Sequence, residues 1–420
     1  MASIPTVDWK NIRLISYLPL SHIAGSLCDI YGPIVINGAY RDSNFVVYFA
    51  RKDALKGSLP KTLKYVKPTL FLGVPRVWEK IEAKLKEIGQ KGGFITKTLG
   101  SIAKSIGAEY FKNKMINGNK HIPLGFKLCD KIIFSKIKKQ LGLDCCQVAA
   151  TAAAPIKAST LKYFGSLNIH ITQIYGLSET SGASTAGIQY HDDVGSVGVP
   201  LKGCEVLIDH VDGRDKINEG EILLRGRNIM SGYLYNKNKS QEAIDSKGFF
   251  HTGDVGKIDD NGLVYITGRI KELIITAGGE NVAPVPIEQY LKTELPALSN
   301  IVLIGDKKKY LTILVTLQCK QNSDGVTFSN TLIGPALKIN PNVTTVDGAR
   351  NDDVWKTYID SAIKKYNNDE NACVSRAQRV QYFCILNGDF SVGIELTDSL
   401  KLKRRVINEK YKQQIQSMYK

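Results

Sequence analysis

Apolar and polar positions change their spacing several times along the chain, and each change marks a different kind of element. Residues 12–20 and 44–50 are rich in apolar and β-branched side chains, so we predict two buried strands joined by turns. From residue 76 to 142, apolar residues recur every three or four positions with lysines between them, which predicts amphipathic helices. The expected buried faces consist of Val77, Ile81, Leu85 and Ile88 in one helix and of Leu128, Ile132, Ile133 and Ile137 in another.

Short strand-like segments separated by Gly, Asp and Asn turns return after residue 142. They cover residues 145–150, 168–175, 205–210, 221–224 and 263–267. This region is therefore predicted to be dominated by strands.

The pattern changes again near Gly268, which predicts a domain boundary. The residues beyond it predict a strand, a glycine turn, a helix and a hairpin, at 273–276, 278–279, from about 286, and at 301–317. Helices near 353–366 and 406–419 flank a strand at 380–386. We expect a large domain over residues 1–267, with a strand-rich subdomain at about 190–267, and a small domain over 268–420.

Composition and length are those of a globular protein that can bury a large core. The chain has 420 residues, of which 43% are hydrophobic and 23% charged. No apolar run approaches the roughly 20 residues of a membrane-spanning helix, and residues 1–10 lack the pattern of a signal peptide, so we expect a soluble, intracellular protein. The eight cysteines show no metal-binding spacing and are predicted to be free thiols.

The net charge of +16 fits an anionic partner: a nucleic acid, a phospholipid surface or a phosphate-rich cofactor. The helix predicted at 127–139 is especially basic. Packing against the core with a solvated lysine face is the favoured interpretation for it, and contact with an anionic membrane is a second hypothesis.

Polar turns that follow predicted strands carry the candidate chemistry. Tyr175 offers a flat face for a base, Ser178 and Thr180 offer hydroxyls, and Glu179 offers a hard oxygen ligand that suits Mg²⁺. The capped start of a helix explains the same residues equally well.

Further along the chain, one acidic and two basic residues add to these candidate ligand-binding residues. Asp254 has the chemistry to accept two ribose hydroxyl hydrogens, or to bond its own backbone in a turn. Arg269 and Lys401 supply positive charge that a nucleotide with separating phosphates requires, although single cations are commonly solvated surface groups.

The sequence lacks the characteristic motifs of several classes of nucleotide-binding and catalytic proteins. The motifs GxxxxGK[ST], GxGxxG and HExxH do not occur in the chain. Residues 176–180 are similar to a nucleophile elbow, but Thr180 stands where the second glycine is needed. A serine hydrolase built on Ser178, His22 and Asp254 is therefore the third hypothesis for the function.

Taken together, five ordered motifs resemble those of the adenylate-forming acyl-CoA synthetases. The motifs are Leu18-Pro-Leu-Ser-His-Ile23, Tyr175-Gly-Leu-Ser-Glu-Thr180, His251-Thr-Gly-Asp254, Gly268-Arg-Ile-Lys-Glu-Leu273 with Thr276-Ala-Gly-Gly-Glu-Asn281, and Leu396-Thr-Asp-Ser-Leu-Lys-Leu-Lys-Arg-Arg405. Gly73-Val-Pro-Arg-Val-Trp-Glu-Lys80 and residues 276–288 are most similar to long-chain fatty acid members of the bubblegum type. The resemblance covers essentially the whole chain.

The resemblance implies an α/β fold, with a large adenylation domain of mixed sheets and helices and a small β-subdomain, followed by a small mobile α+β C-terminal domain. It implies that a long-chain fatty acid, ATP and Mg²⁺ form an acyl-adenylate and pyrophosphate, after which coenzyme A displaces AMP. No nucleic acid is needed as a partner.

The resemblance also implies roles for single residues. Lys401 is the expected adenylation lysine, and His22 lies on the acyl-carboxylate side of the site. Lys271 matches the hinge position. The nucleotide set is Tyr175, Gly176, Leu177, Ser178, Glu179, Thr180, Asp254 and Arg269, with Glu179 as the Mg²⁺ ligand. Gly278 and Gly279 match the loop that approaches the pantetheine channel.

Two departures from the family pattern carry expectations. The Gly/Ser/Thr-rich phosphate loop that precedes the Leu18 motif in the family is not found in residues 1–17, so we expect the large domain to be N-terminally incomplete. Ala152 stands where the family has glycine beside the adenine.

The leading hypothesis is thus an ATP-dependent long-chain fatty acid–CoA ligase in N-terminally truncated form. The second is a catalytically impaired relative that binds nucleotide or acyl-CoA. We expect a cytoplasmic location, with peripheral contact with the endoplasmic reticulum or another membrane as an extension of the membrane hypothesis.

Overall fold

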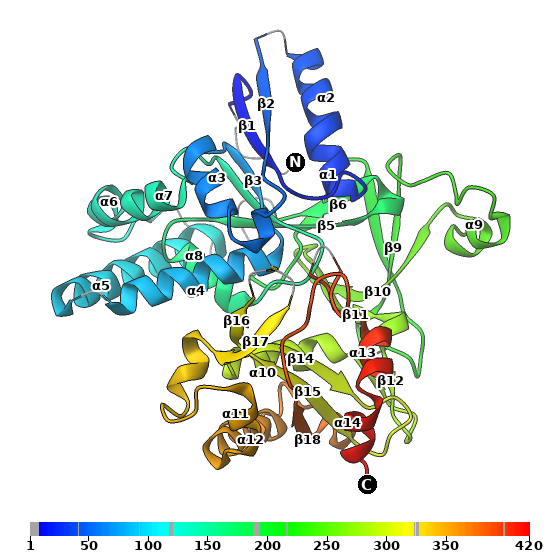
Figure 1. Cartoon of the computed structure of the whole chain (residues 1–420). Helices are drawn as coiled ribbons and strands as arrows, with labels where there is room; N and C mark the ends of the chain where they lie inside the picture. Colours follow the sequence, from blue (N-terminus) through cyan, green and yellow to red (C-terminus); the bar gives the residue numbers. More distant parts are fainter. Residues whose placement is uncertain are drawn as a thin grey trace. The chain divides into compact units, whose positions relative to one another are not determined.

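The computed structural model describes residues 8–40, 42–91, 93–116, 121–187, 194–215, 217–322, 324, 327–397 and 400–420 (Figure 1). The chain divides into two compact units. Unit 1 contains residues 1–210, 218–252 and 256–266, and unit 2 contains residues 211–217, 253–255 and 267–420.

Unit 1 is organised around a seven-stranded sheet in the order β2-β1-β3-β4-β5-β6-β7. Its strands are β1 (Asn11–Ser16), β2 (Asn44–Phe49), β3 (Leu70–Leu72), β4 (Val148–Thr151), β5 (Ile171–Leu177), β6 (Gly182–Ala186) and β7 (Val199–Pro200). Strands β1 to β5 pair with one another in parallel, whereas β6 is antiparallel to β5 and to β7.

The predicted strands near the N-terminus are present, but the prediction that turns join them is wrong. Parallel neighbours need a crossover, and a helical run supplies it through α1 (Ile23–Gly25), η1 (Ser26–Tyr31) and α2 (Gly32–Ala39). Helix α3 (Leu59–Val66) then leads to the short strand β3.

The segment 76–142 is helical, as predicted. It contains α4 (Pro75–Lys91), α5 (Phe94–Phe111), η3 (Lys112–Ile116), α6 (Phe126–Cys129), η4 (Asp130–Phe134) and α7 (Ser135–Leu141), and α8 (Ala158–Gly165) follows β4. The fully buried Trp78 of α4 anchors this layer: its ring packs edge-on against Phe71 and Phe164, and its indole N–H donates to the carbonyl of Ala150 at 3.2 Å.

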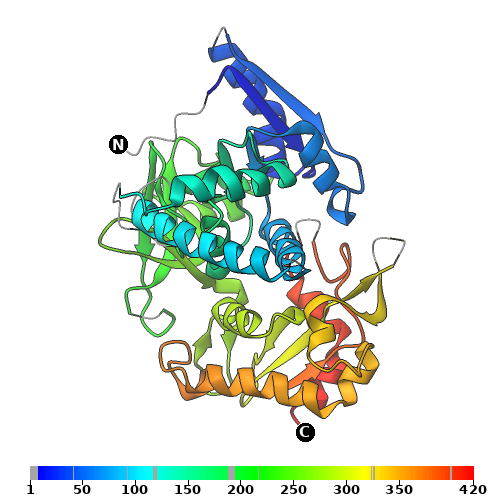
Figure 2. The same cartoon turned by 90° about the vertical axis from the view of Figure 1, so that its left-hand side faces the viewer.

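The predicted buried faces of two helices need correction. Ile88, Leu128 and Ile132 are 53%, 62% and 46% exposed. Ile133 and Ile137 do pack inward, against a cluster that includes Phe126 and Phe134, because the helix turns these positions toward α5. Figure 2 shows α5 (cyan) and the run 126–141 (teal) side by side on the face of unit 1 turned to the viewer.

A second sheet has the order β11-β10-β9-β8. Its strands are β8 (Cys204–Asp209), β9 (Gly220–Gly226), β10 (Phe250–Ile258) and β11 (Val264–Arg269), and helix α9 (Lys237–Ala243) lies between β9 and β10 in sequence. Asp254, for which a turn aspartate was one of the two interpretations, lies within β10, where the neighbouring Gly253 adopts a φ of +70°.

Unit 2 contains a three-stranded sheet in the order β14-β15-β18, formed by β14 (Leu298–Ile304), β15 (Leu311–Leu317) and β18 (Val380–Ile385). Every residue of β15 is buried because helices cover both faces. Leu311, Ile313 and Val315 belong to the cluster with α10 (Pro284–Glu294), α11 (Val346–Asn351) and α12 (Asp353–Asn368). Leu314 points to the opposite cluster, which α13 (Arg404–Lys410) and α14 (Lys412–Ser417) complete.

The single helix expected at 406–419 is two short helices, separated at Tyr411, whose hydroxyl donates to buried Glu395. Two small hairpins complete the unit: β12 (Ile274–Ile275) with β13 (Asn281–Val282), and β16 (Cys319–Gln321) with β17 (Phe328–Leu332). The predicted hairpin across 301–317 is present as the antiparallel pair β14–β15. The α/β fold class with mixed sheets is confirmed.

Candidate functional site

The candidate residues of unit 1 gather where β5 ends. The predicted strand continues two residues beyond Tyr175, because Gly176 and Leu177 pair with β6 after a register shift. Gly176 must lack a side chain here, since a Cβ on it would lie 1.7 Å from the carbonyl oxygen of Gly182. The turn is the short helix η5 (Ser178–Thr180).

Thr180 holds this turn together. Its side chain is fully buried, its hydroxyl accepts the N–H of Leu177 at 2.9 Å, and its hydrogen is in reach of the carbonyls of Leu177 and Gly182. The Thr180 hydroxyl therefore caps the turn, which was the alternative interpretation of these residues from the sequence. Ser178, in contrast, is exposed.

Glu179 is half-buried and presents a carboxylate beside this turn. Its Oε1 accepts a hydrogen bond from the hydroxyl of Tyr233 at 3.0 Å, and its backbone carbonyl accepts the N–H of Met230 at 2.8 Å. Burial, and then the hydrogen bond to the Glu179 carboxylate, raise the pKa of Tyr233. Sequence reasoning missed Tyr233, because nothing near it in sequence indicates that it reaches a residue 54 positions away.

Tyr175 lies in an apolar cluster together with Val206, Ile222, Leu224 and Val264, and only 7% of it is exposed. Its ring thus supports the turn from within the sheet. Ala152 lies in the loop after β4, and its neighbour Ala153 has a φ of +77°, a left-handed conformation that L-residues rarely adopt.

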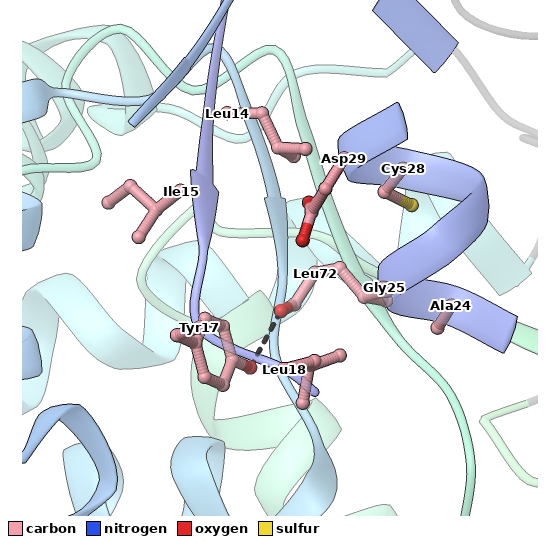
Figure 3. A pocket seen from close by; sticks show the side chains of 9 residues that line it. All are labelled: Leu14, Ile15, Tyr17, Leu18, Ala24, Gly25, Cys28, Asp29 and Leu72. Atoms are coloured by element: carbon pink, nitrogen blue, oxygen red, sulfur yellow. Dashed lines mark hydrogen bonds between the residues drawn. The ribbon is translucent and has the colours of Figure 1, made fainter. Parts of the chain in front are cut away.

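His22 caps the N-terminus of α1, where its Nδ1 accepts the N–H of Ala24 at 3.2 Å. The same segment borders a small hollow between β1 and the α1–η1 run, shown in Figure 3. Tyr17 closes one side by donating to the carbonyl of Leu72 at 2.7 Å, and the Asp29 carboxyl points toward the hollow. Burial raises the pKa of Asp29, and its Oδ2 has no hydrogen-bond partner among the described residues.

The candidate residues of unit 2 form a second group. Arg269 Nε donates to Asp254 Oδ1 at 2.5 Å, and the Asp254 side chain is only 7% exposed whereas that of Arg269 is 47% exposed. One oxygen of the Asp254 carboxylate is thus paired with a guanidinium, whereas the acidic member of a hydrolase triad orients a histidine.

Lys401 is close enough to this pair to feel its charges. The pKa of Lys401 is lowered by desolvation and then by the positive charge of Arg269, while Asp254 and Glu272 act in the opposite direction. Its loop is fixed by the N–H of Lys401, which donates to the Thr397 hydroxyl at 3.0 Å, and by the N–H of Thr397, which donates to the Lys401 carbonyl at 2.9 Å. Residues 398 and 399 of the predicted motif lie outside the described residues.

A buried ion pair holds the residues just beyond this loop. Arg404 donates through both terminal nitrogens to the two carboxylate oxygens of Glu288, each at 2.7 Å, and through Nε to Glu272 at 3.2 Å. Burial by itself would lower the pKa of Arg404, but the charges of Glu288 and Glu272 and the hydrogen bonds to both carboxylates together outweigh burial and raise the pKa. Sequence reasoning quoted these residues within motifs but missed their pairing, since 116 positions separate Arg404 from Glu288.

Glu272 belongs to the short helix η6 (Ile270–Glu272), which also contains the exposed Lys271. The Arg404–Glu272 bond thus connects the segment after Lys401 to the predicted hinge. Gly278 and Gly279 form an exposed turn between β12 and β13, in which Gly279 has a φ of +83° and its N–H donates to Thr276 at 2.9 Å.

The structure therefore brings the predicted residues together in two groups. Residues 175–180 form one group with Tyr233 in unit 1, and Asp254, Arg269 and Lys401 form the other in unit 2. Within the described residues, no three His, Cys, Asp or Glu side chains cluster as a metal centre. No helix in the same part of the chain has the length and apolar content to cross a membrane.

Comparisons with known proteins agree with the predicted family. The model of the AMP-binding enzyme family matches residues 2–234, and the model of the AMP-binding enzyme C-terminal domain matches residues 271–420. Among curated relatives, the chain is 43% identical to long-chain-fatty-acid–CoA ligase ACSBG2 of Gallus gallus over 98% of this chain and 53% of the relative. It is 39% identical to ACSBG2 of Homo sapiens over 98% of this chain and 60% of the relative. The chain spans about half the length of the curated relatives it matches.

Solved structures show the same fold at low sequence identity. The adenylation domain of a carboxylate reductase from Mycobacterium chelonae aligns with a TM-score of 0.63 at 18% identity, covering 97% of this chain and 54% of that one. The o-succinylbenzoate CoA synthetase of Bacillus subtilis, in complex with its acyl-adenylate intermediate, aligns with a TM-score of 0.59 at 18% identity, covering 96% and 61%.

The resemblance to adenylate-forming enzymes of the bubblegum type is thus confirmed by sequence, and the fold by structure. Since the first family model alone covers more than half of the residues, the chain belongs to the AMP-binding enzyme family.

Proposed function

We propose that this chain carries out the ATP-dependent ligation of a long-chain fatty acid to coenzyme A through an acyl-adenylate. In the first step a carboxylate oxygen of the fatty acid bonds to the α-phosphorus of ATP, and the bond to the β-phosphate breaks to release pyrophosphate. In the second step the thiol of coenzyme A attacks the acyl carbonyl and AMP leaves. The observation that carries the proposal is the group of Asp254, Arg269 and Lys401 in unit 2.

Lys401 is the proposed catalytic residue of the first step. Negative charge builds up on the phosphate oxygens as the α–β bond breaks, and a positioned ammonium group stabilises that charge. The bonds between Lys401 and Thr397 hold the backbone of its loop, so the backbone at Lys401 loses little freedom when substrate binds.

Asp254 and Arg269 are proposed to bind the ribose. A carboxylate has several lone-pair sites, so it can accept hydrogen bonds from ribose hydroxyls while it is also paired with a guanidinium. His22 is proposed to lie toward the fatty acid carboxylate, Lys271 to act as the hinge, and Gly278 with Gly279 to leave room for the pantetheine of coenzyme A.

In unit 1, residues 175–180 are proposed to form the nucleotide-binding turn. The exposed Ser178 hydroxyl would contact phosphate, while Tyr175 and Thr180 keep the turn in shape from the inside. Glu179 fits Mg²⁺, because this ion takes one or two protein carboxylates and completes its shell with phosphate oxygens and water. Bound Mg²⁺ would neutralise phosphate charge.

A cytoplasmic location is also proposed. All eight cysteines are free, which is typical of proteins in a reducing compartment.

The function is tested by incubating the purified chain with palmitate, ATP, Mg²⁺ and coenzyme A and measuring palmitoyl-CoA, AMP and pyrophosphate by mass spectrometry. We expect equal amounts of the three products, each dependent on palmitate. Binding of AMP or coenzyme A without any product would overturn the proposal in favour of the impaired relative. Ester hydrolysis that Ser178→Ala abolishes would favour the hydrolase.

A further inference from the structure

The outer face of the run 121–141 exposes large aliphatic side chains in a regular row. Leu124, Leu128 and Ile132 follow one another at intervals of four residues and are 98%, 62% and 46% exposed. The opposite side of the same run is buried through Phe126 and Phe134. Leu128 and Ile132 lie four positions apart on one side of the helical run, and Leu124 lies in the turn just before it, so all three exposed side chains extend the apolar surface away from the core.

The neighbouring helix α5 widens this apolar surface. Leu99 and Ile102 are 54% and 53% exposed, and they share a side of α5 with Ile106. A Cβ on Gly125 would lie 3.6 Å from Cδ1 of Ile106, so the turn that contains Gly125 lies next to that side of α5. Figure 2 shows the two helices lying side by side on this face of unit 1.

Positive charge surrounds the apolar residues. Residues 94–116 and 121–141 contain nine lysines and two acidic residues. Lys127 and Lys131 are exposed next to Leu128 and Ile132 in the sequence. Asp130 does not neutralise them, because it is bonded to Asn168 at 2.8 Å and paired with Lys138 at 3.7 Å.

We propose that this surface, formed by the outer sides of residues 121–141 and of α5, binds a phospholipid bilayer that contains anionic headgroups. Leucine and isoleucine side chains enter the boundary between headgroups and acyl chains, and the lysines remain at the level of the phosphates. The inference concerns where the protein binds, and it does not depend on the ligase function.

Charge complementarity favours a bilayer over a second copy of the chain. Two copies that met through this face would bring two sets of lysines together without matching acidic residues, and this repulsion opposes a symmetric dimer. An anionic bilayer supplies both an apolar layer and the opposite charge. It therefore satisfies both features of the surface at once.

The test measures co-sedimentation of the full chain with vesicles of phosphatidylcholine, with and without phosphatidylserine. Lys127→Gln/Lys131→Gln removes two exposed charges and leaves the buried side of the helix intact. Each basic side chain near an anionic membrane contributes roughly a factor of five to binding, so we expect a loss of roughly 25-fold for the pair. Added salt should weaken binding of the parent in the same way.

A second variant, Leu128→Ser/Ile132→Ser, tests the apolar part. We expect roughly a tenfold loss of vesicle binding with unchanged thermal unfolding, because both side chains are exposed in the folded protein. Helix α3 provides the matched control: Lys61, Lys64 and Tyr65 are exposed there on the same unit. Lys61→Gln/Lys64→Gln and Tyr65→Ser should bind vesicles like the parent.

Three outcomes would overturn the proposal. The first is equal binding to vesicles with and without phosphatidylserine. The second is equal losses in the α3 controls. The third is the absence of vesicle binding by the parent together with a dimer, seen by light scattering, that Leu128→Ser/Ile132→Ser dissociates; the surface would then bind a second copy.

Discussion

Glu288 is the residue whose replacement should reveal how unit 2 holds the segment after Lys401. Its two carboxylate oxygens accept from Arg404, and Oε1 also accepts the N–H of Leu303 at 2.7 Å. Glu288 is 8% exposed and the Arg404 side chain 18% exposed, so water screens this pair weakly. In Glu288→Ala the Arg404 guanidinium stays buried. Among the described residues it keeps one carboxylate partner, because its Nε still donates to Glu272 Oε2 at 3.2 Å.

The expected loss in the free energy of opening of unit 2 comes from leaving the buried Arg404 charge without its main partner. Such losses cost about 3–5 kcal/mol. Because Glu272 still compensates part of the charge, we expect the lower end, about 3 kcal/mol. Glu288→Gln should lose less, since an amide still accepts one of the hydrogen bonds.

The assay is amide hydrogen exchange, followed by mass spectrometry in increasing urea, on peptides that cover β14 and β15. This readout reports the opening of unit 2 by itself. The control is Glu409→Ala on helix α13, where Arg405 and Glu409 form a pair with 91% and 66% exposed side chains. It should change the free energy of opening by less than about 0.5 kcal/mol. The reasoning is refuted if Glu288→Ala stays within about 1 kcal/mol of the parent or matches this control.

Two further perturbations test unit 1. Burial lowers the pKa of His170 to about 4, and neither ring nitrogen has a hydrogen-bond partner among the described residues. The unfolded chain therefore binds this proton more readily, so unit 1 should lose about 3 kcal/mol as the pH falls from the unfolded pKa of about 6.5 toward 4. In His170→Asn the urea midpoint of unit 1 should depend less on pH over this range. A pH dependence equal to that of the parent would contradict the lowered pKa of His170. Gly176→Ala should cost more than about 2 kcal/mol in thermal unfolding because of the carbonyl that its Cβ would meet. Gly38→Ala, with nothing within 4 Å of its Cβ, should be neutral or slightly stabilising, and equal melting of the two variants would disprove the packing argument.

The elements that sequence predicted well are those in which one local pattern decides the structure. The apolar run of β15 is buried on both sides, so its strand could be read without knowledge of its neighbours. The regular spacing in 76–142 likewise predicted helices. It did not predict which side is buried, because Leu128 and Ile132 are as apolar as Ile133 and Ile137, and the packing of α5 decides between them.

The elements that sequence missed depend on contacts between distant residues. The crossover from Ile23 to Ala39 contains glycine and proline and leaves apolar residues such as Ile34 65% exposed, so its pattern did not indicate a helix. In the candidate site, motifs identified the residue types. They could not show that Thr180 uses its hydroxyl within the turn, or that Glu288 pairs with Arg404.

The most direct test of the central claim separates the two half-reactions in Lys401→Ala. Formation of palmitoyl-AMP from palmitate and ATP should fall by about 10² or more, because one positioned group that stabilises transition-state charge is lost. Conversion of preformed palmitoyl-AMP to palmitoyl-CoA should change much less, and Arg405→Ala, an exposed cation four residues away, should leave both rates unchanged. If Lys401→Ala forms palmitoyl-AMP within a few-fold of the parent, or if both half-reactions fall equally, Lys401 is not the adenylation residue and the account is contradicted.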